Sequence, residues 1–230
     1  MKINGFQKLT LLDFPEKMAC IVFTAGCNFR CPFCHNASLV THIDNDAAYT
    51  EEEIFSYLEK RKGLLEGVCI SGGEPLLQPD IEELIKKIKA MGYAVKLDTN
   101  GSFPEKLIHL AESGLIDYVA MDIKNCKEKY ALTAGNEALN IGDIEKSVDF
   151  LLRGTVDYEF RTTVEDSLHT VEDIEKIADW IKGAKRYFLQ NFTDSGDIIA
   201  EKMNSVEKEK INAMLKTALI KGLEAKIRNE

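Results

Sequence analysis

The sequence of 230 residues lacks long hydrophobic runs, an excess of basic residues and a dense set of cysteines. No stretch approaches the roughly 18 consecutive apolar residues of a membrane-spanning helix, and no basic leader precedes an apolar segment of signal-peptide length. The formal net charge is -9, and the absence of a Lys/Arg-rich stripe argues against a general nucleic-acid binder. Six cysteines are too few for a disulfide scaffold at this length. We therefore expect a cytoplasmic protein that binds neither membranes nor nucleic acid.

The hydrophobic pattern predicts an α/β fold, because apolar runs of strand length alternate with amphipathic segments of helix length. The expected strands cover residues 19–25, 66–71, 93–98, 116–122, 157–164 and 186–191. The expected helices cover residues 50–61, 79–91, 103–112, 143–152, 171–182 and 205–226. One of them opens on a capping box, since Thr50 and Glu53 have the required spacing.

Six such βα units would form a partial (βα)6 barrel, with parallel strands inside and helices outside. We expect a single domain over residues 1–230, without internal repeats or linkers. Its parts would be an extended N-terminal segment (1–18), the barrel core (19–191) and a C-terminal helix (204–230). A doubly wound sheet has the same hydrophobic pattern and stays open as the alternative.

Three cysteines, Cys27, Cys31 and Cys34, form a Cys-x3-Cys-x2-Cys triplet directly after the first expected strand. A four-iron cluster is normally held by four cysteines, and a structural zinc by four Cys or His ligands. Three thiolates therefore leave one coordination position free, at which a metal can bind a substrate or cofactor directly. The remaining cysteines have no close Cys neighbour, so we expect them in the core or near the site. They are Cys20, Cys69 and Cys126.

Glycines and polar residues follow the other expected strands, at the carboxyl ends where parallel α/β folds gather their functional groups. The Gly-Gly-Glu-Pro segment 72–75 follows the second strand, and its glycines let backbone groups approach a ligand closely. An ordinary strand-to-helix turn, with Pro75 near the helix start, is the alternative. Later strands contribute Asp98, Thr99, Asn100, Asp122, Lys124, Arg161, Gln190 and Asn191. We expect all of these residues on one rim with the cysteines.

Some of these positions allow two interpretations. The segment 98–100 could cap a helix or contact a ribose. Arg161 could point into the barrel and meet a carboxylate or point outward to solvent, and we prefer the inward orientation. His35 could be a fourth metal ligand, but a side chain next to a cluster cysteine more often supports the ligands from behind. We assign no role to the other histidines, which are His42, His109 and His169.

The cysteine loop from Ala25 to Asn36, with Phe33 directly before the third cysteine, resembles the radical S-adenosylmethionine (SAM) superfamily. The resemblance implies one 4Fe-4S cluster per chain, held by the cysteine triplet, with SAM on its open iron. Reductive cleavage of SAM would give a 5'-deoxyadenosyl radical that removes a hydrogen atom from the substrate. We expect Phe33 to pack on the cluster or the adenine.

The same resemblance implies roles for residues on the rim. The turn of Gly72, Gly73 and Glu74 would hold the α-amino group of SAM, and Lys124 would help to position SAM. A monovalent cation would lie near the SAM carboxylate. Its ligands would be Asp98, Thr99 and Asp122. Gln190 and Asn191 resemble the last-strand residues that line the SAM pocket.

Within the superfamily, the Asp13-Phe14-Pro15 lead-in and the Cys34-His35-Asn36 continuation resemble activators of glycyl radical enzymes. The resemblance is strongest to activators of anaerobic ribonucleoside-triphosphate reductase. It implies hydrogen abstraction from a glycine of a large partner enzyme, with the electron supplied by a flavodoxin or ferredoxin-type protein. Two alternatives stay open. One is a small-molecule radical SAM enzyme such as a 7-carboxy-7-deazaguanine synthase-like protein, and the other is a non-catalytic iron-sulfur or zinc-binding module.

Overall fold

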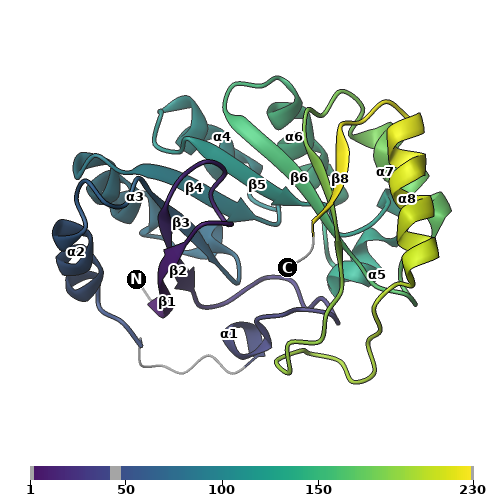
Figure 1. Ribbon diagram of the computed structural model, residues 1–230, viewed down its shortest axis with the longest axis horizontal. Helices are drawn as coiled ribbons and strands as arrows, with labels where there is room; N and C mark the ends of the chain where they lie inside the picture. The colour runs from purple at the N-terminus through teal and green to yellow at the C-terminus, as the bar shows by residue number, and fades with distance from the viewer. Residues whose placement is uncertain (1–2, 42–47, 229–230) are drawn as a thin grey trace.

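The structure, a computed structural model, describes residues 3–41 and 48–228 and is built around one sheet of eight strands in the order β1 to β8 (Figure 1). β1 pairs antiparallel with β2, and each later strand pairs in parallel with the one before it. The strands are β1 (Ile3–Thr10), β2 (Ala19–Thr24), β3 (Gly67–Gly72), β4 (Ala94–Thr99), β5 (Tyr118–Asp122), β6 (Asp157–Val164), β7 (Tyr187–Asn191) and β8 (Ala225–Arg228).

Helices connect the parallel strands and lie around the outside of the curved sheet (Figure 1). They are α1 (Ala37–Thr41), α2 (Glu51–Lys60), α3 (Ile81–Ala90), α4 (Pro104–Glu112), α5 (Tyr130–Ala134), α6 (Ile141–Leu152), α7 (Val171–Trp180) and α8 (Lys208–Ile220), with short 3-10 turns at Pro75–Leu77 and Lys127–Lys129. The strand order never reverses, which excludes the doubly wound alternative. In the part of the chain that the structure describes, β1 and β8 end the sheet, so the barrel is open.

Alternation along the strands divides the apolar core into two parts. Cys20 and Val22 of β2 face the helices and join the large outer core, whereas Ile21 points into the barrel. There Ile21 packs with Phe14 and Tyr118 in a small inner cluster that also contains Ala19 and Cys69. This cluster fills the amino end of the barrel, which leaves the carboxyl ends of the strands for polar side chains.

The expected strands and helices are largely confirmed. The six expected strands correspond to β2 to β7, and Thr50 opens α2 in a capping box with Glu53. The expected extended N-terminal segment contains β1. No helix of residues 3–41 or 48–228 is both long and apolar enough to cross a membrane. His42 lies outside the described residues.

The predicted C-terminal helix is wrong in its length. Instead of filling 204–230 or reaching residue 226, α8 ends at Ile220, and β8 (Ala225–Arg228) returns beside β7. Gly222, with φ of 90°, adopts the left-handed conformation that reverses the chain after the helix. Among the described residues, the barrel therefore has seven parallel strands, β2 to β8, which is one more than the six that we expected.

Candidate active site

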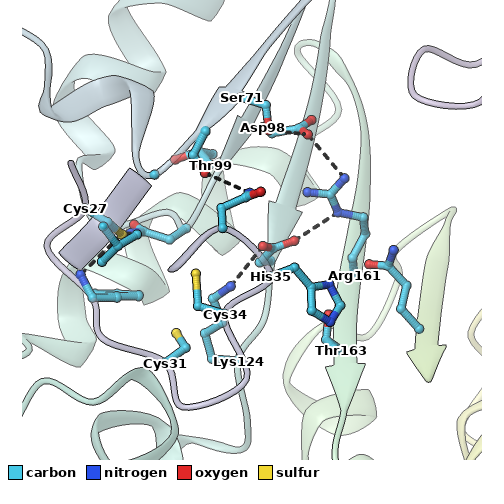
Figure 2. A pocket seen from close by; sticks show the side chains of 18 of the residues that line it. Cys27, Cys31, Cys34, His35, Ser71, Asp98, Thr99, Lys124, Arg161 and Thr163 are labelled. Carbon is cyan, nitrogen blue, oxygen red and sulfur yellow. Dashed lines mark hydrogen bonds and ion pairs between the residues drawn. The ribbon is translucent and has the colours of Figure 1, made fainter. Parts of the chain in front are cut away.

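The carboxyl ends of the strands surround a cavity of about 560 Å³. Figure 2 shows the sulfur atoms of the cysteine loop on one side and the side chains of Asp98 and Arg161 on the other. All but two of the predicted site residues line this cavity. They are Cys27, Cys31, Phe33, Cys34, Gly72, Gly73, Asp98, Thr99, Asn100, Asp122, Lys124, Arg161 and Gln190.

Backbone hydrogen bonds fix the cysteine loop after β2. Gly26 N donates to Leu39 O at 2.8 Å, and Arg30 N donates to Ala134 O at 2.8 Å. Burial raises the pKa of Cys27 to about 12 and that of Cys31 to about 11. A thiol must lose its proton to bind a metal. The positive charge of the metal favours this loss and so offsets the higher pKa that burial causes.

The donor set fits a cluster better than a single ion. Within the described ranges, no three His, Cys, Asp or Glu side chains lie close enough together to hold one metal ion. A four-iron cluster takes each cysteine on a different iron, so its ligands surround a larger body. Phe29 N donates to Cys27 Sγ at 3.3 Å, and Asn100 Nδ2 approaches the same sulfur at 3.8 Å. Such donors tune the potential of a cluster through its sulfurs.

The 72–75 turn packs directly beneath the cysteine loop. Gly73 N donates to Thr24 O at 3.0 Å, and Glu74 N donates to Gly26 O at 2.8 Å. A Cβ at Gly72 would lie 2.3 Å from Thr24 O, and one at Gly73 would lie 2.0 Å from Gly26 O. Only glycine permits this approach, so the turn is part of the site as well as a strand-to-helix connection.

Glu74 departs from its predicted position. We expected its carboxylate to face a cofactor, but the side chain is fully buried and does not line the cavity. Its oxygens accept hydrogen bonds from Leu76 N, Thr99 Oγ1 and Asn100 N at 3.1, 2.9 and 2.7 Å. Burial raises the pKa of Glu74 to about 7, against the effect of these donors. The carboxylate braces the turn after β4, and the glycines of 72–73 line the cavity in its place.

Asn100 does not cap a helix, because α4 begins at Pro104 with Phe103 as the preceding residue. Its side-chain oxygen accepts from Ser102 N at 2.9 Å, and its amide donates to Asn28 Oδ1 at 2.9 Å. The side chain therefore ties the turn after β4 to the cysteine loop.

A row of alternating charges crosses the barrel from β4 to the end of β5. The Lys96 ammonium donates to Asp98 Oδ1, and Arg161 Nη1 lies 3.5 Å from Asp98 Oδ2. Arg161 Nε donates to Asp122 Oδ1 at 2.9 Å, and Lys124 Nζ donates to Asp122 Oδ2 at 2.9 Å (Figure 2). The preferred inward orientation of Arg161 is confirmed.

Neighbouring charges keep Asp98, Asp122 and Lys124 of this row ionised. Burial alone would raise the pKa of both carboxyls. Arg161 and Lys96 instead hold the pKa of Asp98 below its usual range. Arg161 and Lys124 do the same for the pKa of Asp122. Burial would lower the pKa of Lys124, yet the Asp122 carboxylate raises it above its ordinary value. The cavity therefore presents fixed charges.

The last predicted pair divides between the two faces of β7. Gln190 lines the cavity, whereas Asn191 points away and binds the backbone of Val206 through both atoms of its amide, at 2.8 Å each. Adjacent residues of a strand face opposite sides, so the two cannot share the cavity. The prediction that Asn191 lines the site is wrong.

Sequence reasoning missed several residues of the site. Arg228 of β8 reaches the cavity and forms two hydrogen bonds with Glu159, at 2.7 and 3.0 Å. The alternation of Ala225 to Arg228 covers only four residues, which is too short a signal to predict a strand from the sequence. The cavity is also lined by Leu12, Asp13, Phe23, Phe29, His35, Asn36, Val40, Ser71 and Thr163.

The histidines have distinct environments. His35 lines the cavity, and its ring centroid lies 5.3 Å from that of Phe192. His169, to which we assigned no role, is buried with Nε2 at 2.8 Å from Lys124 O and its ring edge-to-face with Phe33. It therefore supports two residues of the cavity wall. His109 is exposed on the surface beside Glu82. Cys20, Cys69 and Cys126 are buried and do not line the cavity.

Comparison with known proteins places this site in a family. The profile of the Radical SAM superfamily matches residues 21–181. A protein of Methanocaldococcus jannaschii, provisionally named a glycyl-radical enzyme activating enzyme, is 36% identical over 196 residues, which cover 83% of this chain and 79% of that protein. The pyruvate formate-lyase-activating enzyme of Clostridium pasteurianum is 27% identical over 214 residues, covering 88% of this chain and 87% of that enzyme.

Solved structures agree on the fold. Streptococcus suis SuiB superposes with a TM-score of 0.68 at 16% identity, covering 91% of this chain and 48% of SuiB. A domain of a pyruvate-formate lyase-activating enzyme from Bacteroides vulgatus superposes with a TM-score of 0.57 at 18% identity, covering 71% of this chain and 99% of that domain. Family membership implies a 4Fe-4S cluster and SAM as cofactors. The chain belongs to the radical SAM superfamily and, within it, to the glycyl-radical enzyme activating enzymes.

Proposed function

We propose that this chain removes a hydrogen atom from a glycine Cα of anaerobic ribonucleoside-triphosphate reductase and so installs the glycyl radical of that partner. The observation that carries the proposal is the cysteine triplet in a cavity that charged side chains also line, namely Asp98, Arg161, Asp122 and Lys124. Cysteines hold a cluster, and fixed charges suit a ligand that carries both an ammonium and a carboxylate.

The residues of the chain would divide the work of binding. A bound cluster and SAM together supply the 5'-deoxyadenosyl radical. Gly72 and Gly73 would offer backbone groups to the ammonium of SAM, because no side chain stands between them and the cavity. Lys124 and Arg161 would face its carboxylate. Phe33 is buried on the cavity wall next to Cys34, where it would exclude water from the cluster.

A protein substrate is supported by the way the cavity reaches the surface. Leu12, on the connection between β1 and β2, lines the cavity although 82% of its surface is exposed. The cavity is thus open near this connection, where a loop of a partner enzyme could enter. A small-molecule enzyme is expected to close over its substrate. The relatives that cover most of the chain are named for the activation of other enzymes.

The choice of reductase as the partner is supported by the Asp13-Phe14-Pro15 lead-in and the Cys34-His35-Asn36 continuation. We also propose a flavodoxin or ferredoxin-type protein as the electron donor. Each reductive cleavage of SAM consumes one electron, and proteins of these types transfer single electrons.

The test begins with anaerobic reconstitution of the protein with iron and sulfide. Addition of dithionite and SAM should release 5'-deoxyadenosine, which chromatography measures. The reconstituted protein is then mixed with the anaerobic reductase of the same genome and, in parallel, with a pyruvate formate-lyase. Electron paramagnetic resonance should show a glycyl radical on the reductase.

The possible results separate the parts of the proposal. A glycyl radical on pyruvate formate-lyase alone would refute the partner and keep the activase. Strong stimulation of SAM cleavage by a free nucleoside or pterin, without any protein partner, would refute the activase and favour a small-molecule enzyme. A protein that binds zinc and cleaves no SAM would favour the binding module.

A further inference from the structure

The oxygen atoms that the family resemblance assigns to a monovalent cation are already engaged by groups of the chain. Asp98 binds Lys96 through one oxygen and accepts from Ser71 Oγ at 3.1 Å through the other. Thr99 Oγ1 donates to Glu74 and accepts from Gly101 N at 3.1 Å. The oxygen atoms of Asp98 and Thr99 are therefore not available to coordinate a further cation.

Asp122 is engaged in the same way. One of its oxygens accepts from Arg161 and the other from Lys124, both at 2.9 Å. Each carboxylate therefore lies between two cationic side chains, because Arg161 also approaches Asp98. A further ion beside these carboxylates would meet like charges at short range.

Lys96 is the unusual member of this arrangement. It occupies a strand position between Val95 and Leu97, and only 1% of its side chain is exposed. Lys96 and Asp98 lie two residues apart on β4 and therefore point into the barrel together. A buried ammonium is retained only with a partner, and the partner of Lys96 is the Asp98 carboxylate.

We propose that Lys96 is a built-in cation, which neutralises Asp98 and makes SAM binding by this chain independent of sodium and potassium ions. Lys96 does not line the cavity, so it is a positioning residue: it fixes Asp98, and through Asp98 it orients Arg161 toward the ligand. The inference rests on the proposed binding of SAM in this cavity.

The test measures SAM affinity of the reconstituted enzyme without a reductant, so that no turnover occurs. The dissociation constant is determined in buffers whose only monovalent cation is potassium, sodium or tetramethylammonium, which is too large for a carboxylate cage. The wild-type values should agree within about twofold, whereas Lys96→Met should bind SAM about tenfold more weakly in tetramethylammonium and recover most of the loss in potassium or sodium. Recovery by a small cation is a result that a merely structural lysine would not give.

Two further variants make the comparison sharp. Lys96→Arg keeps the charge and should remain independent of the cation. Lys86→Met removes an exposed lysine of α3 and should behave as the wild type in every buffer. Iron content and circular dichroism report whether each variant folds and loads its cluster.

The outcomes are distinguishable. Wild-type affinity that rises tenfold or more with potassium or sodium would overturn the inference even if Lys96→Met failed to fold. Equal affinity of Lys96→Met and wild type in tetramethylammonium would overturn it as well. Failure of the wild type to bind SAM in every buffer would instead overturn the proposed function on which it rests.

Discussion

Replacement of Gly73 by alanine tests whether the 72–75 turn and the cysteine loop form one unit. The new Cβ would lie 2.0 Å from Gly26 O, whereas ordinary contact begins at 3.4 Å. The turn and the loop must therefore separate by about 1.4 Å, which is too far for the 2.8 Å bond from Glu74 N to Gly26 O and the 3.0 Å bond from Gly73 N to Thr24 O. Loss of two partly buried backbone hydrogen bonds should lower the free energy of unfolding by about 2 to 5 kcal/mol.

In a chain of this size, each kcal/mol lowers the melting temperature by about 2 to 4 °C, so Gly73→Ala should melt roughly 5 to 20 °C below the wild type. Thermal unfolding of the metal-free protein measures this change, and iron content after reconstitution should fall with it. Gly142→Ala is the matched control. Gly142 also lacks a positive φ, but its Cβ would meet only the side chain of Asn140, at 3.2 Å. If Gly73→Ala melts and loads iron like Gly142→Ala, the turn does not pack beneath the loop as described.

Two further predictions concern the cysteines and Glu74. Cys31→Ala should abolish cluster loading and SAM cleavage. Cys126→Ala, at a buried position away from the cavity, should leave both largely intact. Equal losses in the two variants would show that the cluster ligands are misassigned. Because burial raises the pKa of Glu74 from 4.5 to about 7, the folded state keeps a proton that the unfolded state has released. The free energy of unfolding should therefore fall by up to about 3 kcal/mol as the pH rises from about 4.5 to about 7, and Glu74→Gln should lack this contribution. Urea unfolding between about pH 4 and pH 8 compares the two proteins, and parallel curves would contradict the shift.

The sequence predicted the barrel because periodicity and strand ends carry local information. β6 (Asp157–Val164) matches its predicted range in full, and the cysteine triplet has a spacing that few other sites share. The placement of site residues on one rim follows from the geometry of parallel strands, so most of the cavity wall could be named in advance. Glu74 shows the limit of that reasoning, since sequence puts it at the rim but cannot say which way its side chain turns.

β8 and Lys96 escaped prediction for a different physical reason. The strand at 225–228 is only four residues long and follows a helix, so its alternation is too short to stand out from a continuing helix. Lys96 lies in a run of strand-forming residues, and a lysine in such a run normally points outward into solvent. Its burial depends on Asp98 beside it and on Arg161 from β6, which are contacts of tertiary structure.

The charged row explains why this barrel is filled differently at its two ends. At the amino end, Phe14 and Tyr118 pack into an apolar cluster that stabilises the fold by removing their surface from water. At the carboxyl end, an ion pair with a buried member, such as Lys96 with Asp98, contributes less stability than apolar residues of similar volume would. A barrel selected for stability alone would have continued the apolar cluster toward the carboxyl ends of the strands. The charges are therefore best understood as part of a binding site, whose fixed geometry is retained at the expense of stability.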